Sequence, residues 1–284
     1  MKVERIAVIG TGTMGNGIAG QAALSGFGVT MFDVDAERVQ AALDRIERTW
    51  KKGVDRGKVP AEKVEAGRAR LKTATDLDAA IGDADLIIEA VPERMPLKKQ
   101  LFATFEAQSG PETLLASNTS SLSLTEIASA TGCPERVLGM HFFNPVAVMP
   151  LVELVRGHYT APETMAAGRA VAEAMGKQCI EVNDSPGFAT SRLGIALGNE
   201  AMRMFEEGVA SAEDIDKAMV LGYRHPIGPL ALTDLVGLDV RLAISEHLHR
   251  EIGSDTFRPP RILRQMVRAG KLGRKVGQGF YSYD

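Results

Sequence analysis

A glycine-rich hexapeptide, Gly10-Thr11-Gly12-Thr13-Met14-Gly15, follows an apolar segment at Ile6 to Ile9 and precedes a helical pattern from Asn16. The next apolar segment, Val29 to Phe32, ends at an acidic residue, Asp33. A strand, a glycine turn, a helix, a second strand and an acid in this order form the fingerprint of a dinucleotide-binding βαβ unit. We therefore expect this part of the chain to bind the pyrophosphate of a dinucleotide.

Each residue of the fingerprint has a physical task. Gly10 allows a tight turn, Gly12 lets the backbone approach the pyrophosphate, and Gly15 lets the helix pack closely on the strand. The helix N-terminus offers N–H groups and the positive end of its dipole to the phosphates. Asp33 can accept hydrogen bonds from the adenosine ribose, and its charge would repel a 2′-phosphate, so the sequence favours NAD over NADP.

A second candidate for chemistry is His141, near the end of the apolar run Val137 to Phe143. Ligands of open α/β sheets bind beyond the carboxyl ends of the strands. Imidazole titrates near neutral pH, so His141 could accept a proton from an alcohol as hydride leaves. Taken alone, it could equally be a buried structural histidine. The other four histidines fall in turns or amphipathic helices and are expected at the surface: His158, His225, His247 and His249.

Glu153 lies in the middle of the apolar run Leu151 to Val155, where a carboxylate is costly unless it is paired. His141 is an available partner on an adjacent strand, and the pair would fix the imidazole tautomer and stabilise the imidazolium. The alternative is that Glu153 faces solvent from an edge strand. Ser120 follows another strand end, where its hydroxyl could meet a substrate oxygen or cap a helix.

The surrounding pattern predicts an α/β domain followed by a helical one. Apolar segments predict strands at 6–9, 29–32, 85–91, 114–117, 137–143 and 151–155. Helical patterns predict helices at 16–25, over 36–70 with a break at 57–60, at 96–105 and from Leu124. Such alternation predicts a parallel, doubly wound sheet of Rossmann-like type.

A turn-rich segment at 183–187 ends this alternation. Beyond it the chain is almost wholly helical in pattern, with a long helix over 189–207, a capping box at 211–214 and helices to Arg268. We place the domain boundary between residues 183 and 184. Residues 1–183 are then the NAD-binding domain, and residues 184–284 form an all-α C-terminal domain.

Composition excludes several classes of protein. The chain has 284 residues, of which 45% are hydrophobic and 24% charged, which is ordinary for a globular protein. A net charge of −3 provides no positive field for nucleic acid or an anionic membrane. The two cysteines lack metal-site spacing, so we expect no metal and reduced thiols in a cytoplasmic protein. The first strand begins close to Met1, and the apolar runs are too short to span a bilayer, so we expect neither a leader nor a membrane anchor.

Six motifs distributed along the chain are shared with one known family. They are GTGTMG at 10–15, SNTSSL at 117–122, HFFNPVAVMPLVELV at 141–155, SPGF at 185–188, HPIGPLALTDLVGLD at 225–239 and GRKVGQGFYSY at 273–283. Through them the chain resembles the L-3-hydroxyacyl-CoA dehydrogenase family, in its bacterial 3-hydroxybutyryl-CoA dehydrogenase form.

The resemblance implies a reversible NAD-dependent oxidation of (S)-3-hydroxyacyl-CoA to 3-oxoacyl-CoA, with an expected preference for a short C4 acyl group. It implies that His141 is the general acid/base, that Glu153 orients it, and that Ser120 contacts the reacting end of the substrate. The implied cofactor contacts are Gly10, Gly12, Thr13, Met14, Gly15, Asp33, Glu93, Lys98, Ser120, Asn144 and Lys275. The implied substrate contacts are Thr49, Arg56, Ser120, Asn144 and Ser191. The helical domain is expected to bind substrate and to build a homodimer, as in the family.

The segment from Arg45 to Lys58 follows the second strand, where the family binds the CoA tail. It carries six basic residues, which suit the phosphates of CoA: Arg45, Arg48, Lys51, Lys52, Arg56 and Lys58. A solvated helix face has a similar composition, so composition alone does not identify a CoA site.

One departure from the family concerns the motif after Pro-Gly-Phe, where the family has Asn-Arg-Leu and this chain has Ser191-Arg192-Leu193. Serine is shorter than asparagine, so its contact with substrate could be lost, relayed by water or made differently. Two alternative functions stay open: a related NAD dehydrogenase of a free hydroxy acid, of the gulonate or carnitine type, and a non-enzymatic, crystallin-like protein. The retention of both His141 and Glu153 argues against the second.

Overall fold

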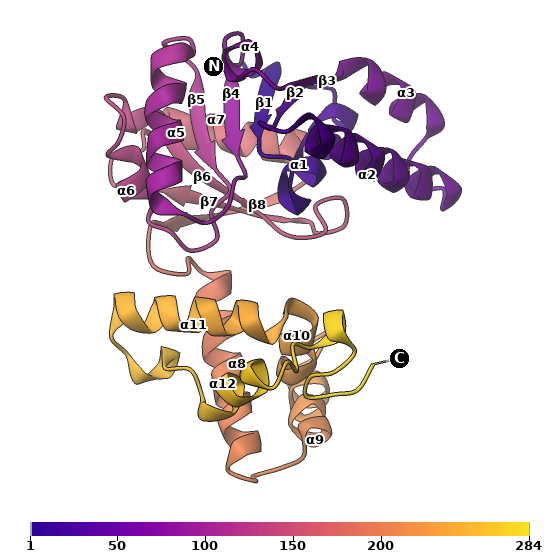
Figure 1. The fold of residues 1–284 in the computed structure, drawn as a ribbon, viewed down its shortest axis with the longest axis vertical. Helices are drawn as coiled ribbons and strands as arrows, with labels where there is room; N and C mark the ends of the chain where they lie inside the picture. Colours follow the sequence, from indigo (N-terminus) through magenta and orange to yellow (C-terminus); the bar gives the residue numbers. More distant parts are fainter. Residues whose placement is uncertain (1, 284) are drawn as a thin grey trace. The chain divides into compact units, whose positions relative to one another are not determined.

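The structure, a computed structural model, describes residues 2–283 of the chain. By its internal contacts the chain divides into two units, Met1–Asp184 and Ser185–Asp284. This division lies one residue beyond the boundary that the turn-rich segment predicts. The named strands all belong to the first unit, and the second unit is built of helices and short helical turns (Figure 1).

One eight-stranded sheet, in the order β3-β2-β1-β4-β5-β6-β7-β8, forms the centre of the first unit. Its strands are β1 Arg5–Ile9, β2 Gly28–Phe32, β3 Leu71–Ala74, β4 Leu86–Glu89, β5 Leu114–Ser117, β6 Val137–Phe142, β7 Leu151–Arg156 and β8 Gln178–Asn183. Because the strand order reverses between β1 and β4, the crevice for a ligand is expected at the carboxyl ends of these two strands.

The helices of the first unit are α1 Thr13–Leu24, α2 Ala36–Asp55, α3 Ala61–Arg70, α4 Leu77–Ile81, α5 Met95–Gln108, α6 Leu124–Ala128 and α7 Pro162–Ala174. Residues of α1, α2 and α7 share one apolar core with alternate residues of the central strands. Figure 1 shows α5 and α6 in front of the sheet, with α7 behind it. The Rossmann-like, doubly wound fold predicted from the sequence is therefore confirmed.

Two strands depart from the predicted parallel arrangement. Strand β7 runs antiparallel to β6, and β8 is parallel to β7. The connection from β6 to β7, residues 143–150, contains no helix. A parallel return needs a crossover of about a dozen residues or more, so this short connection brings the chain back antiparallel.

Four elements of the first unit were not predicted: β3, α4, α7 and β8. Strands β3 and β8 are the two edges of the sheet, and most of their residues are exposed or half-buried. Such strands need not be apolar, so they lack the buried runs from which the central strands were predicted.

The second unit contains α8 Thr190–Glu206, α9 Ala212–Lys217, α10 Pro229–Val236, α11 Leu238–Ile252 and α12 Arg261–Arg268. Its main core includes buried side chains of α8, α9, α10, α11 and α12. A capping box was predicted at 211–214; in the structure Ser211 caps α9, since its side chain accepts a hydrogen bond from the Asp214 N–H and its hydroxyl donates to Asp214 Oδ2. The predicted all-α character of the C-terminal domain is confirmed.

Candidate active site

The glycine turn after β1 shows why two of its three glycines cannot carry a side chain. Gly10 has a φ of +100°, and a Cβ on it would lie 2.8 Å from the Ala90 carbonyl oxygen. A Cβ on Gly15 would lie 1.7 Å from the Gly10 carbonyl oxygen. Nothing lies within 4 Å of a Cβ built on Gly12. The first and third glycines thus serve backbone packing, and the second leaves open space for a phosphate group.

A cavity of about 740 Å³ lies at this turn. It is lined by Ile9, Gly10, Thr11, Gly12, Thr13, Met14, Phe32, Asp33, Val34, Arg38, Arg45, Ala90, Val91, Pro92, Leu97 and Leu101. Helix α1 begins at Thr13, earlier than predicted, and has neither a side-chain cap nor an acid in its first turn. Its first N–H groups and its positive dipole end are therefore suited to the pyrophosphate of a dinucleotide.

Asp33, directly after β2, lines the same cavity. Its Oδ2 accepts hydrogen bonds from the Thr11 N–H at 3.0 Å and from the Thr11 hydroxyl at 2.8 Å. These bonds hold the carboxylate beside the glycine turn, where it fits an adenosine ribose and disfavours a 2′-phosphate. The glycine turn, the helix N-terminus and Asp33 together fit NAD.

His141 and Glu153 lie directly opposite each other on the antiparallel strands β6 and β7. The imidazole Nδ1 is 2.7 Å from Glu153 Oε2, and Glu153 is 0% exposed. The alternative of an edge-strand glutamate facing solvent is wrong, because β8 pairs with the other side of β7. Since the carboxylate faces Nδ1, it favours the tautomer with hydrogen on Nδ1 and directs proton transfer to Nε2.

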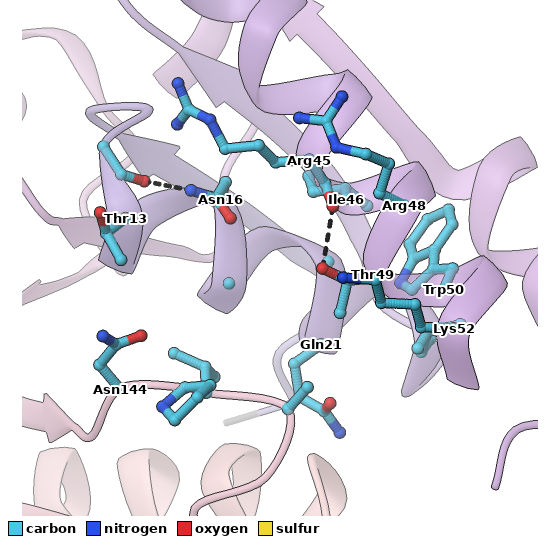
Figure 2. Close-up of a pocket in the computed structure, with 17 residues that line it drawn as sticks. Thr13, Asn16, Gln21, Arg45, Ile46, Arg48, Thr49, Trp50, Lys52 and Asn144 are labelled. Carbon is cyan, nitrogen blue, oxygen red and sulfur yellow. Dashed lines mark hydrogen bonds between the residues drawn. The ribbon is translucent and has the colours of Figure 1, made fainter. Parts of the chain in front are cut away.

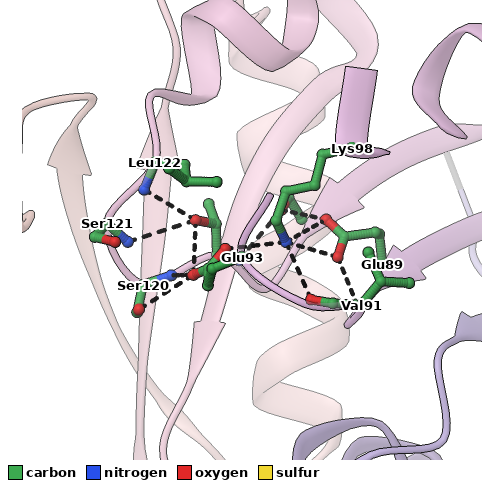
Figure 3. A network of polar contacts seen from close by, with 9 residues as sticks. Glu89, Val91, Glu93, Lys98, Ser120, Ser121 and Leu122 are labelled. Carbon is green, nitrogen blue, oxygen red and sulfur yellow. Dashed lines mark hydrogen bonds and ion pairs between the residues drawn. The ribbon is translucent and has the colours of Figure 1, made fainter. Parts of the chain in front are cut away.

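Glu93 holds the turn that follows β5, where Ser120 lies. Glu93 Oε1 accepts hydrogen bonds from the Ser120 N–H at 2.7 Å, from the Ser120 hydroxyl at 3.2 Å and from the Thr119 hydroxyl at 3.0 Å (Figure 3). Its other oxygen, Oε2, is 3.2 Å from the Lys98 ammonium. Ser120 and Glu93, predicted separately, are thus in direct contact.

Lys98 is 1% exposed, and its ammonium lies between two carboxylates. Besides Glu93, it contacts both oxygens of Glu89, at 2.7 and 2.9 Å (Figure 3). Lys98 therefore holds the Glu93 carboxylate in place. It is not among the residues that line the cavity at the glycine turn.

Glu89, the last residue of β4, was not predicted as a site residue. It is 0% exposed, and it also accepts hydrogen bonds from the Ser117 hydroxyl and the Val91 N–H, each at 2.7 Å. The signal was the same as for Glu153, a carboxylate within an apolar run, followed nine positions later by Lys98. A second unpredicted residue is Asn118, whose Oδ1 accepts the Phe142 N–H at 2.9 Å and joins the ends of β5 and β6.

A second cavity, of about 590 Å³, lies between α1, α2 and residues 144–147. Its lining includes Thr49 and Asn144, and Figure 2 shows Arg45, Arg48 and Lys52 along α2. Three basic side chains beside a helix N-terminus give this cavity the charge that phosphate groups require. Arg56, predicted with Thr49, is exposed near the end of α2 and does not line this cavity, because the helix carries it away from α1.

Two predicted residues belong to the second unit. Ser191 lies in the first turn of α8 and is half-buried. Lys275 lies in the short turn Arg274–Val276, where its ammonium contacts both oxygens of Asp239 at 2.5 and 2.6 Å. This pair lowers the pKa of the Asp239 carboxyl.

No group of three or more histidine, cysteine, aspartate or glutamate side chains within residues 2–283 could hold a metal ion. Likewise, none of the helices described there combines the length and the apolarity that crossing a membrane requires.

Comparisons with known proteins agree over the whole chain. The family described as "3-hydroxyacyl-CoA dehydrogenase, NAD binding domain" matches residues 5–185, and "3-hydroxyacyl-CoA dehydrogenase, C-terminal domain" matches residues 187–283. A protein of Bacillus subtilis (strain 168), named "Probable 3-hydroxybutyryl-CoA dehydrogenase", is 46% identical over 100% of this chain and 99% of its own length.

Two solved structures are similar in fold as well as in sequence. FadB2 of Mycobacterium tuberculosis is 41% identical, with a TM-score of 0.96. The (S)-3-hydroxybutyryl-CoA dehydrogenase PaaH1 of Ralstonia eutropha is also 41% identical, with a TM-score of 0.95. Each comparison covers 100% of both chains.

Proposed function

The chain belongs to the 3-hydroxyacyl-CoA dehydrogenase family, and on this premise we propose that it interconverts (S)-3-hydroxyacyl-CoA and 3-oxoacyl-CoA with NAD, acting on 3-hydroxybutyryl-CoA. The observation that carries the proposal is the buried pair of His141 and Glu153, on the sheet whose glycine turn fits NAD. A general base oriented by a carboxylate is what oxidation of an alcohol requires.

The proposed reaction moves one proton and one hydride. His141 accepts the proton of the substrate hydroxyl at Nε2, and Glu153 stabilises the resulting imidazolium through Nδ1. When bound, NAD supplies the acceptor for the hydride that leaves C3, so that the C3–H bond breaks as the carbonyl forms. In the reverse direction the His141 imidazolium donates its proton to the oxygen.

Two further groups position the reactants. Ser120 orients the reacting oxygen, and Glu93, braced by Lys98, holds the turn on which Ser120 lies. The cavity along α2 takes the phosphates and pantetheine of CoA against Arg45, Arg48 and Lys52. Asn144 and Ser191 complete the contacts that the family implies.

The proposal extends to assembly and location. Several apolar side chains of the second unit are exposed, among them Leu193, Leu221 and Tyr223, and a homodimer would cover such surface. Sedimentation velocity of the full chain tests this directly, since a monomer at micromolar concentration would contradict it. We also propose a cytoplasmic location, on the basis of two cysteines with no disulfide spacing.

The decisive experiment is an initial-rate assay with NADH and acetoacetyl-CoA, followed by longer 3-oxoacyl-CoA esters. Rapid NADH oxidation with the C4 ester would support the proposal, and the chain-length profile would define the acyl preference. Free hydroxy acids of the gulonate and carnitine type, assayed with NAD in the oxidative direction, serve as controls. No turnover of any CoA ester, despite NADH binding, would contradict the proposal and favour a free hydroxy acid or a structural role.

A further inference from the structure

Lys177, directly before the edge strand β8, is a buried cation to which the proposed reaction assigns no task. The residue is 7% exposed, and burial lowers the pKa of its ammonium. Among residues 2–283, no carboxylate pairs with this ammonium, which donates instead to the backbone carbonyls of Val146 and Met149, the second at 3.0 Å. Because a buried ammonium without a carboxylate is costly, the reason for this charge must lie in the segment that it contacts.

Both carbonyls belong to the connection between β6 and β7, residues 143–150. The N–H groups of Val148 and Met149 donate to the Pro145 carbonyl at 2.9 Å each, so the connection forms a single helical turn. The later carbonyls of such a turn have no partner within it, and a cation at this end satisfies them and complements the local dipole. Lys177 is that cation, and it ties the turn to the beginning of β8.

The segment that contains Lys177 also contacts helix α1. Gln21 of α1 donates from Nε2 to the Met175 carbonyl at 2.9 Å, so residues 175–177 hold both α1 and the connection. The helix and the connection meet at Gly17, where a Cβ would lie 2.9 Å from Val146 Cγ2. Val146 is therefore fixed from two sides, by the bare backbone of α1 and by the ammonium that binds its carbonyl.

Helix α1 and the connection are walls of the cavity that the proposed function assigns to CoA. Figure 2 shows Gln21 of α1 and Asn144 of the connection in its lining, which includes residues 144–147. Lys177 is not among the lining residues, so it acts on this cavity only through the connection. The cavity at the glycine turn takes no lining residue from 143–150. A shift of the connection would therefore change the first cavity and leave the second as it is.

His141 is held in place independently of Lys177. Its strand, β6, pairs with β7, and the Phe142 N–H at the end of β6 donates to Asn118 Oδ1 at 2.9 Å. The imidazole itself is held by Glu153. We therefore expect loss of the Lys177 ammonium to move the cavity wall and to leave the general base where it is.

We propose that Lys177 is a positioning residue for CoA, whose ammonium fixes residues 144–147 as the cavity wall against which the CoA part of the substrate binds. This inference rests on the proposed function and adds to it a residue that touches neither substrate nor cofactor. Because Lys177 acts through two backbone carbonyls of the connection, it governs the affinity for CoA and not the affinity for NADH or the chemical step.

The test compares two thioesters with the same reacting group, acetoacetyl-CoA and acetoacetyl-N-acetylcysteamine, of which the second lacks the phosphates and most of the pantetheine. With the full-length enzyme and NADH, we expect Lys177→Met to lower kcat/KM for acetoacetyl-CoA by about 10-fold, mainly through KM, and that for the short thioester by less than about threefold. Calorimetric titration should show free CoA binding about 10-fold more weakly and NADH binding as in the wild type. Lys177→Arg should recover part of the loss. Lys72→Met, an exposed position on the edge strand β3, is the matched control and should behave as the wild type.

Several outcomes would overturn the proposal. An equal loss with both thioesters in Lys177→Met would indicate a structural role alone, and unchanged kinetics with acetoacetyl-CoA would show that the wall does not depend on the ammonium. If Lys177→Met failed to fold, Gly17→Ala would test the same wall, because its Cβ would displace Val146 from the α1 side. Unchanged CoA affinity in Gly17→Ala would also contradict the proposal. Absence of acetoacetyl-CoA turnover by the wild type would instead refute the proposed function and this inference with it.

Discussion

Lys98 in the first unit and Arg241 in the second are both buried cations, and they differ in what surrounds them. Lys98 lies between Glu89 and Glu93, at distances of 2.7 to 3.2 Å from their oxygens. Arg241 lies against the glycine backbone of α8, with no acid of the described chain beside it. The paired charge holds Glu93 at the turn that carries Ser120, whereas no acid of the described residues forms an ion pair with Arg241.

The pair of His141 and Glu153 also joins two buried side chains of the first unit. Breaking this pair should have the largest effect on activity. We expect His141→Ala to lower kcat by about 100- to 10,000-fold, because the general base is lost. NADH affinity, measured by fluorescence titration, should stay close to wild type, since the imidazole lies outside the glycine turn. His158→Ala, an exposed position, serves as control, and near-full activity of the His141 variant would exclude this residue from the mechanism.

Removing the buried ammonium of Lys98 should lower the stability of the fold. We expect Lys98→Met to lower the free energy of unfolding by about 3 to 5 kcal/mol, because Glu89 would remain buried without its counter-ion. Urea unfolding measures this change. The double variant Glu89→Gln/Lys98→Met should recover part of the loss. A loss below about 1 kcal/mol in the single variant would mean that the ion pair is not needed.

Replacing the buried Arg241 of the second unit should not lower stability in the same way. We expect Arg241→Met to leave the free energy of unfolding unchanged or to raise it by about 1 kcal/mol or more, because an unpaired buried charge is replaced by an apolar side chain. The same urea titration gives the answer. If the variant were destabilised by about 3 kcal/mol, Arg241 would have a partner that contributes to folding, and the contrast with Lys98 would fail.

The smallest effect is expected at Ser191, in the first turn of α8. Ser191→Asn restores the residue that the family has at this position, with a longer side chain and an added donor. We expect the variant to match or exceed the wild-type rate with acetoacetyl-CoA in the NADH assay. A large loss of activity would show that the pocket is adapted to serine at position 191 instead of the asparagine expected from the family.

Several features could be predicted from the sequence because they depend on local chemistry. Gly10 needs a positive φ, Gly15 needs close packing on β1, and both needs follow from a turn that joins a strand to a helix. Glu153 was predicted to be paired because a carboxylate in an apolar run requires a partner. The same reasoning would have found Glu89, which has the same signal.

Long-range geometry accounts for what the sequence left open. The antiparallel return of β7 depends on the length of one connection, and it places Glu153 opposite His141. That Lys98 lies against Glu89 and Glu93 depends on how α5 packs beside the end of β4.

By itself, the sequence determined the dinucleotide fingerprint, the two-part organisation and the residues that could carry a proton, because each reflects the conformational or solvation needs of a short segment. Only the tertiary structure decided which buried charges are neutralised. The sequence does not reveal whether an acid lies beside a residue such as Arg241, because any such acid would come from an element distant along the chain.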